Sequence, residues 1–127
     1  MKKLTALLLA ALLLVGCSAA PKDADFRQIS QEEAASLMET EENYIILDVR
    51  RPDEFASGHI PGAVNIPNET IGDEEIPELP HKDQLILVYC RSGNRSKQAS
   101  GKLAALGYTN IVEFGGISTW PGEIVTD

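Results

Sequence analysis

The sequence predicts one α/β domain with a parallel sheet, and three observations favour that class. Strand-like and helix-like segments alternate along the chain, as they do where crossover helices join parallel strands. Two short runs, Tyr44–Val49 and Gln84–Tyr89, are mostly apolar, which is typical of strands covered on both faces. The length of 127 residues and the hydrophobic content of 43% indicate a single globular domain.

The first half of the domain is expected to hold two helices and three strands. Ser30 and Glu33 have the spacing of a capping box, so a helix follows in which Ala34, Leu37 and Met38 share one face. Proline near its first turn begins a second, short helix over Pro52–Ser57. The strands predicted in this half are Phe26–Ile29, Tyr44–Val49 and Ala63–Ile66.

The second half begins with an acidic segment, Asn68–Lys82, which contains two prolines and is expected to be a surface connection with little regular structure. A strand, a helix that ends at Gly107 and a last strand follow it: Gln84–Tyr89, Ser96–Leu106 and Ile111–Phe114. The pair Gly115-Gly116 is expected to break the last strand, and a short turn or helix ends at Trp120.

The N-terminal residues have the layout of a secretory signal. Lys2 and Lys3 precede an apolar run, Leu4–Val15, which is too short to span a bilayer. The run ends in Leu14-Val15-Gly16-Cys17, which resembles the lipobox of bacterial lipoproteins, where the Cys is acylated and becomes the first mature residue. A generic cleaved signal with an incidental Cys is the alternative.

These features predict three parts: a signal peptide over 1–16, a lipidated N-terminus and linker over 17–25, and the folded domain over 26–127. The mature protein is expected to be extracytoplasmic, tethered by lipid to the periplasmic side of a bacterial membrane or to the cell surface. Stable attachment of this kind needs more than one acyl chain.

Charge and cysteine content exclude several function classes. The net charge is −8; without Lys2 and Lys3, nine basic residues face nineteen acidic ones, and the charge becomes −10. Such a chain is a poor binder of nucleic acid. Two Cys and two His are too few for a disulfide framework or a Cys/His zinc site. If Cys17 is lipidated, Cys90 is the one remaining thiol, and it is either buried and inert or present for its chemistry.

The turn after Tyr89 is the predicted chemical centre. Cys90 leaves the end of a buried strand and faces the start of a helix, where free backbone N–H groups and the helix dipole favour a thiolate. Gly93 allows the loop to bend so that several N–H groups converge on one anion. From Gln84 to Val112 the sequence contains no Asp or Glu but several cations, and these make a local basic window: Arg91, Arg95, Lys97 and Lys102.

The loop resembles the active loop of the rhodanese sulfurtransferases, over Cys90–Ser96. Other segments agree with the N-terminal and C-terminal motifs of that family: Leu47–Arg50 with Glu54-Phe55, Gly58–Ala63, Asn65–Pro67, and Gly115-Gly116 followed by Trp120. The resemblance covers roughly Ile29–Trp120 in the right order. It implies a compact α/β domain with a five-stranded, mainly parallel sheet flanked by helices.

The resemblance also implies sulfane-sulfur transfer. Cys90 would attack the outer sulfur of an anionic donor such as thiosulfate and hold it as a persulfide, which cyanide or a thiol acceptor would remove. Arg91 and Arg95 would attract the donor. The other loop residues would contribute backbone or short polar contacts: Ser92, Gly93, Asn94 and Ser96. No metal or organic cofactor is required.

Two other functions are weighed against sulfur transfer. Tyrosine-phosphatase-like enzymes and arsenate reductases also place a Cys after a strand and an Arg before a helix, but with five residues between them, whereas four separate Cys90 from Arg95. The shorter loop favours a single sulfur atom over a phosphoryl group. The other alternative is a non-catalytic persulfide carrier or redox sensor at the membrane. The sequence assigns no particular protein partner.

Three residues outside the loop are candidates for a supporting role. Asp48 and Arg50 end a buried strand on the same sheet edge as Cys90; Asp48 could orient the loop, or Arg50 could reach substrate. The favoured interpretation is that charged residues pair locally around the short helix: Arg50, Arg51, Asp53 and Glu54. Trp120 could line the mouth of the site, although a lone Trp near a terminus is more often a packing anchor.

Overall fold

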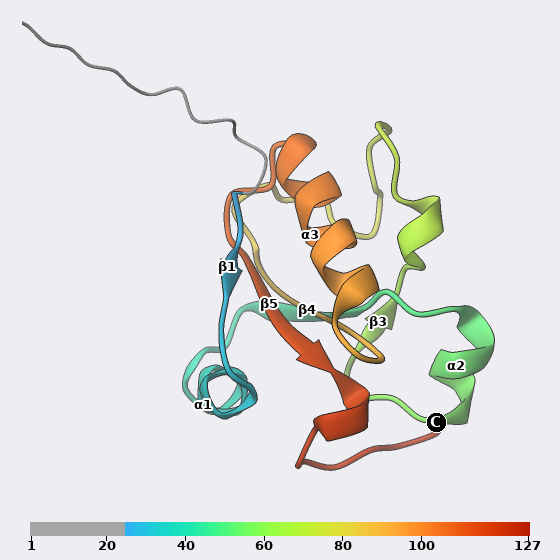
Figure 1. Ribbon diagram of the computed structural model, residues 1–127. Helices are drawn as coiled ribbons and strands as arrows, with labels where there is room; N and C mark the ends of the chain where they lie inside the picture. Colours follow the sequence, from blue (N-terminus) through green and yellow to red (C-terminus); the bar gives the residue numbers. More distant parts are fainter. Residues whose placement is uncertain (1–24) are drawn as a thin grey trace, which may run out of the picture.

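The computed structural model describes residues 25–127, which form a five-stranded sheet with helices on both faces (Figure 1). The strands lie in the order β1-β5-β4-β2-β3, and every neighbouring pair is parallel. Their bounds are β1 Arg27–Gln28, β2 Tyr44–Asp48, β3 Val64–Asn65, β4 Leu85–Cys90 and β5 Ile111–Gly116. The predicted α/β class is confirmed, and the sheet is entirely parallel where mainly parallel pairing was expected.

The helices are α1 Gln31–Thr40, α2 Pro52–Ser57 and α3 Asn94–Ala105, with one-turn 3-10 helices at Asn68–Thr70 and Ile117–Thr119. The predicted capping box begins α1: the Glu33 N–H donates to Ser30 Oγ at 3.0 Å, and the Ser30 N–H donates to Glu33 Oε1 at 3.1 Å. Two of the four unsatisfied donors of this helix end are thereby paired.

The sheet separates two apolar cores, because successive side chains of a strand point to opposite faces. Val88 and Cys90 of β4 lie in the core that Ala99 and Leu103 of α3 complete. Leu87 and Tyr89 lie in the other core, with Ala34 of α1. Figure 1 shows α1 and α3 on opposite sides of the sheet. This alternation places the Cys90 side chain on the face that α3 covers.

The structure differs from the sequence-based prediction where glycines change the backbone. Helix α3 begins at Asn94, two residues earlier than expected, because Gly93 takes a left-handed conformation (φ 110°) at its N-cap. Strand β5 continues through Gly115-Gly116 and does not end at Phe114. Gly115 has φ 94°, and the pairing register shifts between Val88 and Cys90 so that Cys90 lies opposite Gly116.

The acidic connection between β3 and β4 contributes to the core more than predicted. Ile71, Ile76 and Leu79 are buried there, and they belong to the core on the α3 face of the sheet. The surface connection expected from charge and proline content therefore also covers one edge of the α3 core, because its isoleucines and leucine bury apolar area.

The described residues contain no helix long and apolar enough to cross a membrane. The predicted signal peptide, Cys17 and the linker as far as residue 24 lie outside the described residues.

Candidate active site

The Cys90 thiol lies at the carboxyl end of β4, between β2 and β5 in the middle of the sheet. The residue is only 1% exposed. The backbone N–H of Gly93 donates to Cys90 Sγ at 3.0 Å, and Ser96 Oγ lies 3.3 Å from the same sulfur. The sulfur is thus held by the loop that follows it and by the first turn of α3.

The sulfur also lies at the N-terminal end of α3. The first backbone N–H groups of a helix have no intrahelical acceptor, and the helix dipole adds positive partial charge there. The first turn of α3 carries no acidic residue. Of the several N–H groups expected to converge on Cys90, the one of Gly93 is within hydrogen-bond distance of Sγ.

Strand β5 supports the loop through its backbone. A Cβ atom added at Gly116 would overlap the carbonyl group of Arg91 and the amide nitrogen of Ser92, so only glycine fits against the loop at this position. The Arg91 carbonyl oxygen accepts from Ser118 twice, from its N–H at 3.1 Å and from its Oγ at 2.9 Å. These contacts tie the loop to β5 and to the 3-10 helix that follows β5.

The two loop arginines differ in environment. Arg91 is exposed. Arg95 is bound in a two-pronged ion pair with Glu54 of α2, with N···O distances of 2.7 and 3.1 Å. The hydrogen bond from Arg95 lowers the pKa of Glu54 to about 2, and the same bond raises the pKa of Arg95. Arg95 therefore joins the loop helix to α2, and Arg91 is the exposed cation of the loop.

Among the remaining loop residues predicted to contact substrate, Ser92 and Asn94 are exposed and Gly93 and Ser96 are buried. Ser96 Oγ donates within the site, with Gly93 O at 3.1 Å and Glu113 Oε2 at 2.5 Å among its partners. The exposed pair lies at the surface of the loop, and the buried pair touches the sulfur.

Asp48 and Arg50 form a buried ion pair with each other. Arg50 Nη2 lies 2.7 Å from Asp48 Oδ2 and donates to the carbonyl oxygen of Gly58 at 2.7 Å. The side chains are 0% and 6% exposed, and the guanidinium lies 5.8 Å from the Tyr89 ring. The pair joins the end of β2 to the segment after α2, whereas the pairing expected around the short helix is seen between Arg51 and Asp53.

Trp120 packs against Phe114, with ring centroids 5.4 Å apart, and it belongs to the core on the α1 face. The face of the sheet that it covers is therefore the one opposite to Cys90, and its position agrees with a packing anchor.

Residues 30–123 match the family described as Rhodanese-like domain. The chain belongs to the rhodanese-like family. It is 34% identical over 104 residues to thiosulfate sulfurtransferase GlpE of Pseudomonas entomophila, a match that covers 78% of this chain and 92% of the relative. It is 32% identical over 111 residues to the adenylyltransferase and sulfurtransferase UBA4 of Candida albicans, of whose length it spans 25%.

Solved structures agree with this assignment of the fold. A crystal structure of a rhodanese-related protein from Thermoplasma volcanium superposes with a TM-score of 0.67 at 30% sequence identity, over 80% of this chain and 99% of that one.

Sequence reasoning missed three residues of this rhodanese-like domain that contact the loop: Glu54, Glu113 and Ser118. Glu54 and Glu113 are acids that approach the segment predicted to be locally basic, so the acid-free stretch of sequence is not an acid-free region in space. A signal existed for Glu113, because it interrupts the apolar strand Ile111–Phe114. Glu54 belongs to the motif segment Glu54-Phe55, but nothing in the sequence indicated its contact with Arg95, which lies 41 positions later.

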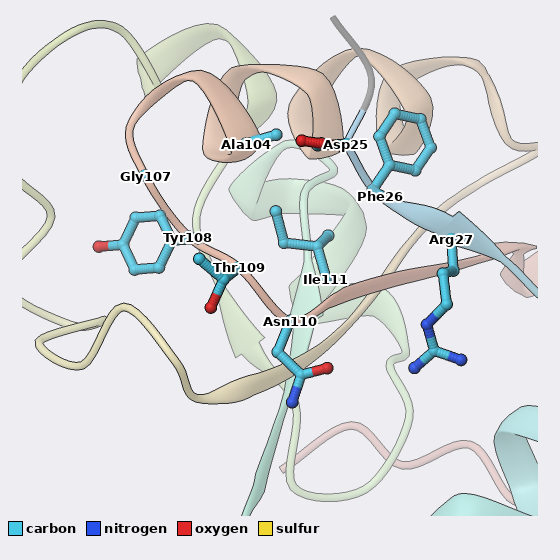
Figure 2. A pocket seen from close by; sticks show the side chains of 9 residues that line it. All are labelled: Asp25, Phe26, Arg27, Ala104, Gly107, Tyr108, Thr109, Asn110 and Ile111. Atoms are coloured by element: carbon cyan, nitrogen blue, oxygen red, sulfur yellow. The ribbon is translucent and has the colours of Figure 1, made fainter. Parts of the chain in front are cut away.

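A cavity of about 410 Å³ lies at the other end of the sheet (Figure 2). Residues that precede β5, together with the start of β1, line it: Asp25, Phe26, Arg27, Ala104, Gly107, Tyr108, Thr109, Asn110 and Ile111. None of them belongs to the Cys90 loop. In open α/β sheets ligands bind beyond the carboxyl ends of the strands, so the loop and not this cavity is the candidate active site.

Proposed function

We propose that this rhodanese-like protein is a sulfurtransferase that carries sulfane sulfur as a persulfide on Cys90. The Cys90 thiolate attacks the outer sulfur of a donor such as thiosulfate; a new S–S bond forms, the bond to the sulfite group breaks, and sulfite leaves with the bonding electron pair. A thiol or cyanide acceptor then attacks the outer sulfur of the persulfide, and the Cys90 thiolate is released. This is covalent catalysis in two steps.

The observation that carries the proposal is the Gly93 N–H donating to Cys90 Sγ at the N-terminus of α3. A backbone donor and a helix dipole fixed beforehand stabilise a negative sulfur without rearrangement during the reaction. The relative GlpE, whose name is that of a thiosulfate sulfurtransferase, matches over 92% of its length and supports thiosulfate as a donor.

We assign the surrounding residues on the same basis. Arg91, exposed beside the nucleophile, attracts an anionic donor, while Ser92 and Asn94 lie at the surface of the loop. Arg95 holds the loop geometry through Glu54. Asp48, Arg50 and Trp120 act as scaffold.

The experiment is intact-mass measurement of the purified full chain before and after incubation with thiosulfate. We expect wild type to gain one sulfur atom, and cyanide to remove it with formation of thiocyanate. Cys90→Ser should gain none, whereas Cys17→Ser, which removes the other cysteine of the chain, should gain it as wild type does. Failure of wild type to gain sulfur, or an equal gain in Cys90→Ser, would contradict the proposal.

We also infer that the protein acts at a membrane through a lipid on Cys17. The inference is supported by the order of two lysines, an apolar run and Leu14–Cys17. In a bacterial host, wild type should label with a fatty-acid analogue and stay in the membrane fraction after a high-salt wash. Cys17→Ser should do neither; its retention in washed membranes would contradict the anchor.

A further inference from the structure

A buried carboxyl group lies behind the thiol. Glu113 is on β5 and is only 2% exposed. Its Oε2 accepts from Ser96 Oγ at 2.5 Å and from the Gly115 N–H at 3.0 Å. Ser96 Oγ in turn lies 3.3 Å from Cys90 Sγ. A continuous chain of hydrogen-bond contacts therefore joins the sulfur to the carboxyl through one hydroxyl group.

The hydroxyl of Ser96 has one hydrogen and cannot donate to two groups at once. If it donates to a Glu113 carboxylate, it gives no hydrogen to Gly93 O or to the sulfur, and the sulfur can join the chain only as a thiol that donates to Ser96 Oγ. If it donates to a Cys90 thiolate, Ser96 Oγ and Glu113 Oε2 face each other with no hydrogen between them unless Glu113 carries one. The protonation states of Cys90 and Glu113 are thus coupled.

In the part of the chain that the structure describes, no cation is paired with Glu113 to compensate a second negative charge. Within residues 25–127 it forms no salt bridge. Three cations on the elements around it are exposed, namely Arg27 of β1, Arg91 of the loop and Lys97 of α3. The other two cations of α3 have partners elsewhere: Arg95 is paired with Glu54, and Lys102 donates to the carbonyl oxygen of Asn68. Ser96 Oγ and the Gly115 N–H can stabilise one negative charge on Glu113, but a thiolate joined to that carboxylate through one hydroxyl adds a second buried charge that no cation compensates.

We propose that Cys90 and Glu113 share one proton through Ser96, and that the reactive thiolate exists with the proton on Glu113. The proposal rests on the proposed function of Cys90. When the thiolate forms, the Sγ–H bond breaks and leaves its electron pair on sulfur, that proton joins Ser96 Oγ, and the Ser96 hydrogen moves to Glu113 Oε2. No charge leaves the site, and no other reactant is needed.

The consequence is a nucleophile formed without a second negative charge in the pocket. An anionic donor then meets one buried charge instead of two. Ser96 and Glu113 are positioning residues for the proton and for the sulfur, since neither needs to touch the donor.

The decisive measurement is infrared spectroscopy of the full chain at neutral pH, where exposed carboxyl groups are ionised. We expect wild type to show the C=O stretch of a protonated carboxyl. It should be absent in Glu113→Gln and present in Glu39→Gln, a matched change at an exposed glutamate of α1. Capping Cys90 with methyl methanethiosulfonate, which leaves a small neutral disulfide, should abolish it. No band in wild type, or a band that survives capping, would overturn the proposal.

A second measurement tests the bridging hydroxyl. At neutral pH, Ser96→Ala should alkylate at Cys90 roughly tenfold more slowly than wild type, because a hydrogen bond to a charged group is lost. Ser100→Ala is the matched control: Ser100 is equally buried on α3, and its hydroxyl has no hydrogen-bond partner among residues 25–127. Equal alkylation rates in the two variants would overturn the bridging role.

The outcomes separate this inference from the proposed function. If the persulfide forms on Cys90 but the carboxyl band survives capping, proton sharing alone is overturned. Absence of the persulfide overturns the proposed function. The comparison before and after capping uses wild type only, so it stands if a variant fails to fold.

Discussion

Replacement of Glu54 by Gln removes the charge that holds Arg95 and, with it, the link between α2 and the helix that follows the nucleophile. The hydrogen bond from Arg95 lowers the pKa of Glu54 from 4.5 to about 2. At ~1.36 kcal/mol for each pH unit, this corresponds to about 3 kcal/mol of stabilisation. The Arg95 side chain is 28% exposed, and solvent screening reduces the figure. We expect Glu54→Gln to lower the free energy of unfolding at neutral pH by about 1–2 kcal/mol.

The pH dependence has a definite sign. Because the folded-state pKa of Glu54 lies below its unfolded value, the stabilisation is complete above pH 4.5 and disappears as the pH falls towards 2. The difference between wild type and Glu54→Gln should therefore be largest near neutral pH and should shrink through that interval. Urea unfolding, followed by the fluorescence of the single tryptophan, measures it at each pH.

Asp53→Asn provides the matched control for this prediction. Asp53 is the neighbouring acid and also pairs with an arginine, but its side chain is 71% exposed, so the loss should be much smaller than in Glu54→Gln. Equal losses in the two variants would refute the assignment of Glu54 as a partly buried, stabilising carboxylate. If Glu54→Gln lost as much free energy of unfolding near pH 2 as at neutral pH, that result would also refute the assignment.

Three further predictions concern the loop and its support. Gly116→Ala should abolish persulfide formation and destabilise the fold by about 1–3 kcal/mol, because its Cβ overlaps the Arg91 carbonyl. Gly101→Ala, where α3 leaves open space for a Cβ, should stabilise the fold by about 0.5–1 kcal/mol. Urea unfolding measures both stabilities, and intact mass measures the persulfide. Arg91→Ala should raise KM for thiosulfate with kcat largely kept, and the rise in KM should be smaller in added salt. Arg95→Ala should lower kcat. Steady-state rates at two ionic strengths check both variants, and equal, salt-independent losses of kcat would contradict the two roles. Asp48→Asn should cost about 3–5 kcal/mol in urea unfolding, because it leaves a buried guanidinium without its partner; a cost below about 1 kcal/mol would contradict the buried pair.

The sequence predicts most of the fold because its local signals agree with one another. The capping box at Ser30, the apolar strands around Leu47 and Val88, and the stop at Gly107 are each set by residues within a few positions, and the structure has all of them. Strand β5 and the start of α3 were misjudged at Gly115 and Gly93. There, left-handed backbone serves a bulge and a helix cap instead of ending an element.

The candidate site was predictable only as far as it is local. Cys90, Gly93 and Ser96 lie within seven residues of one another, and the structure brings them into contact. The acids that complete the site arrive from α2 and β5, at separations of 41 and 17 residues from their partners on α3. Such contacts depend on strand order and register, which a local pattern does not contain.

The distant acids change how the loop attracts an anion. The sequence alone indicates attraction through two arginines, but Glu54 neutralises Arg95 and Glu113 lies behind the sulfur. What remains to draw a donor is Arg91 at the surface and the oriented N–H groups at the start of α3. The dipole of a helix end acts only within its first turn. A donor far from the site therefore experiences the attraction of Arg91 against the repulsion of an acidic chain, and the other favourable interactions begin once its sulfur has reached the loop. Binding should accordingly depend on short-range geometry more than on long-range charge, which is why the fit of Gly116 beneath the loop matters as much as either arginine.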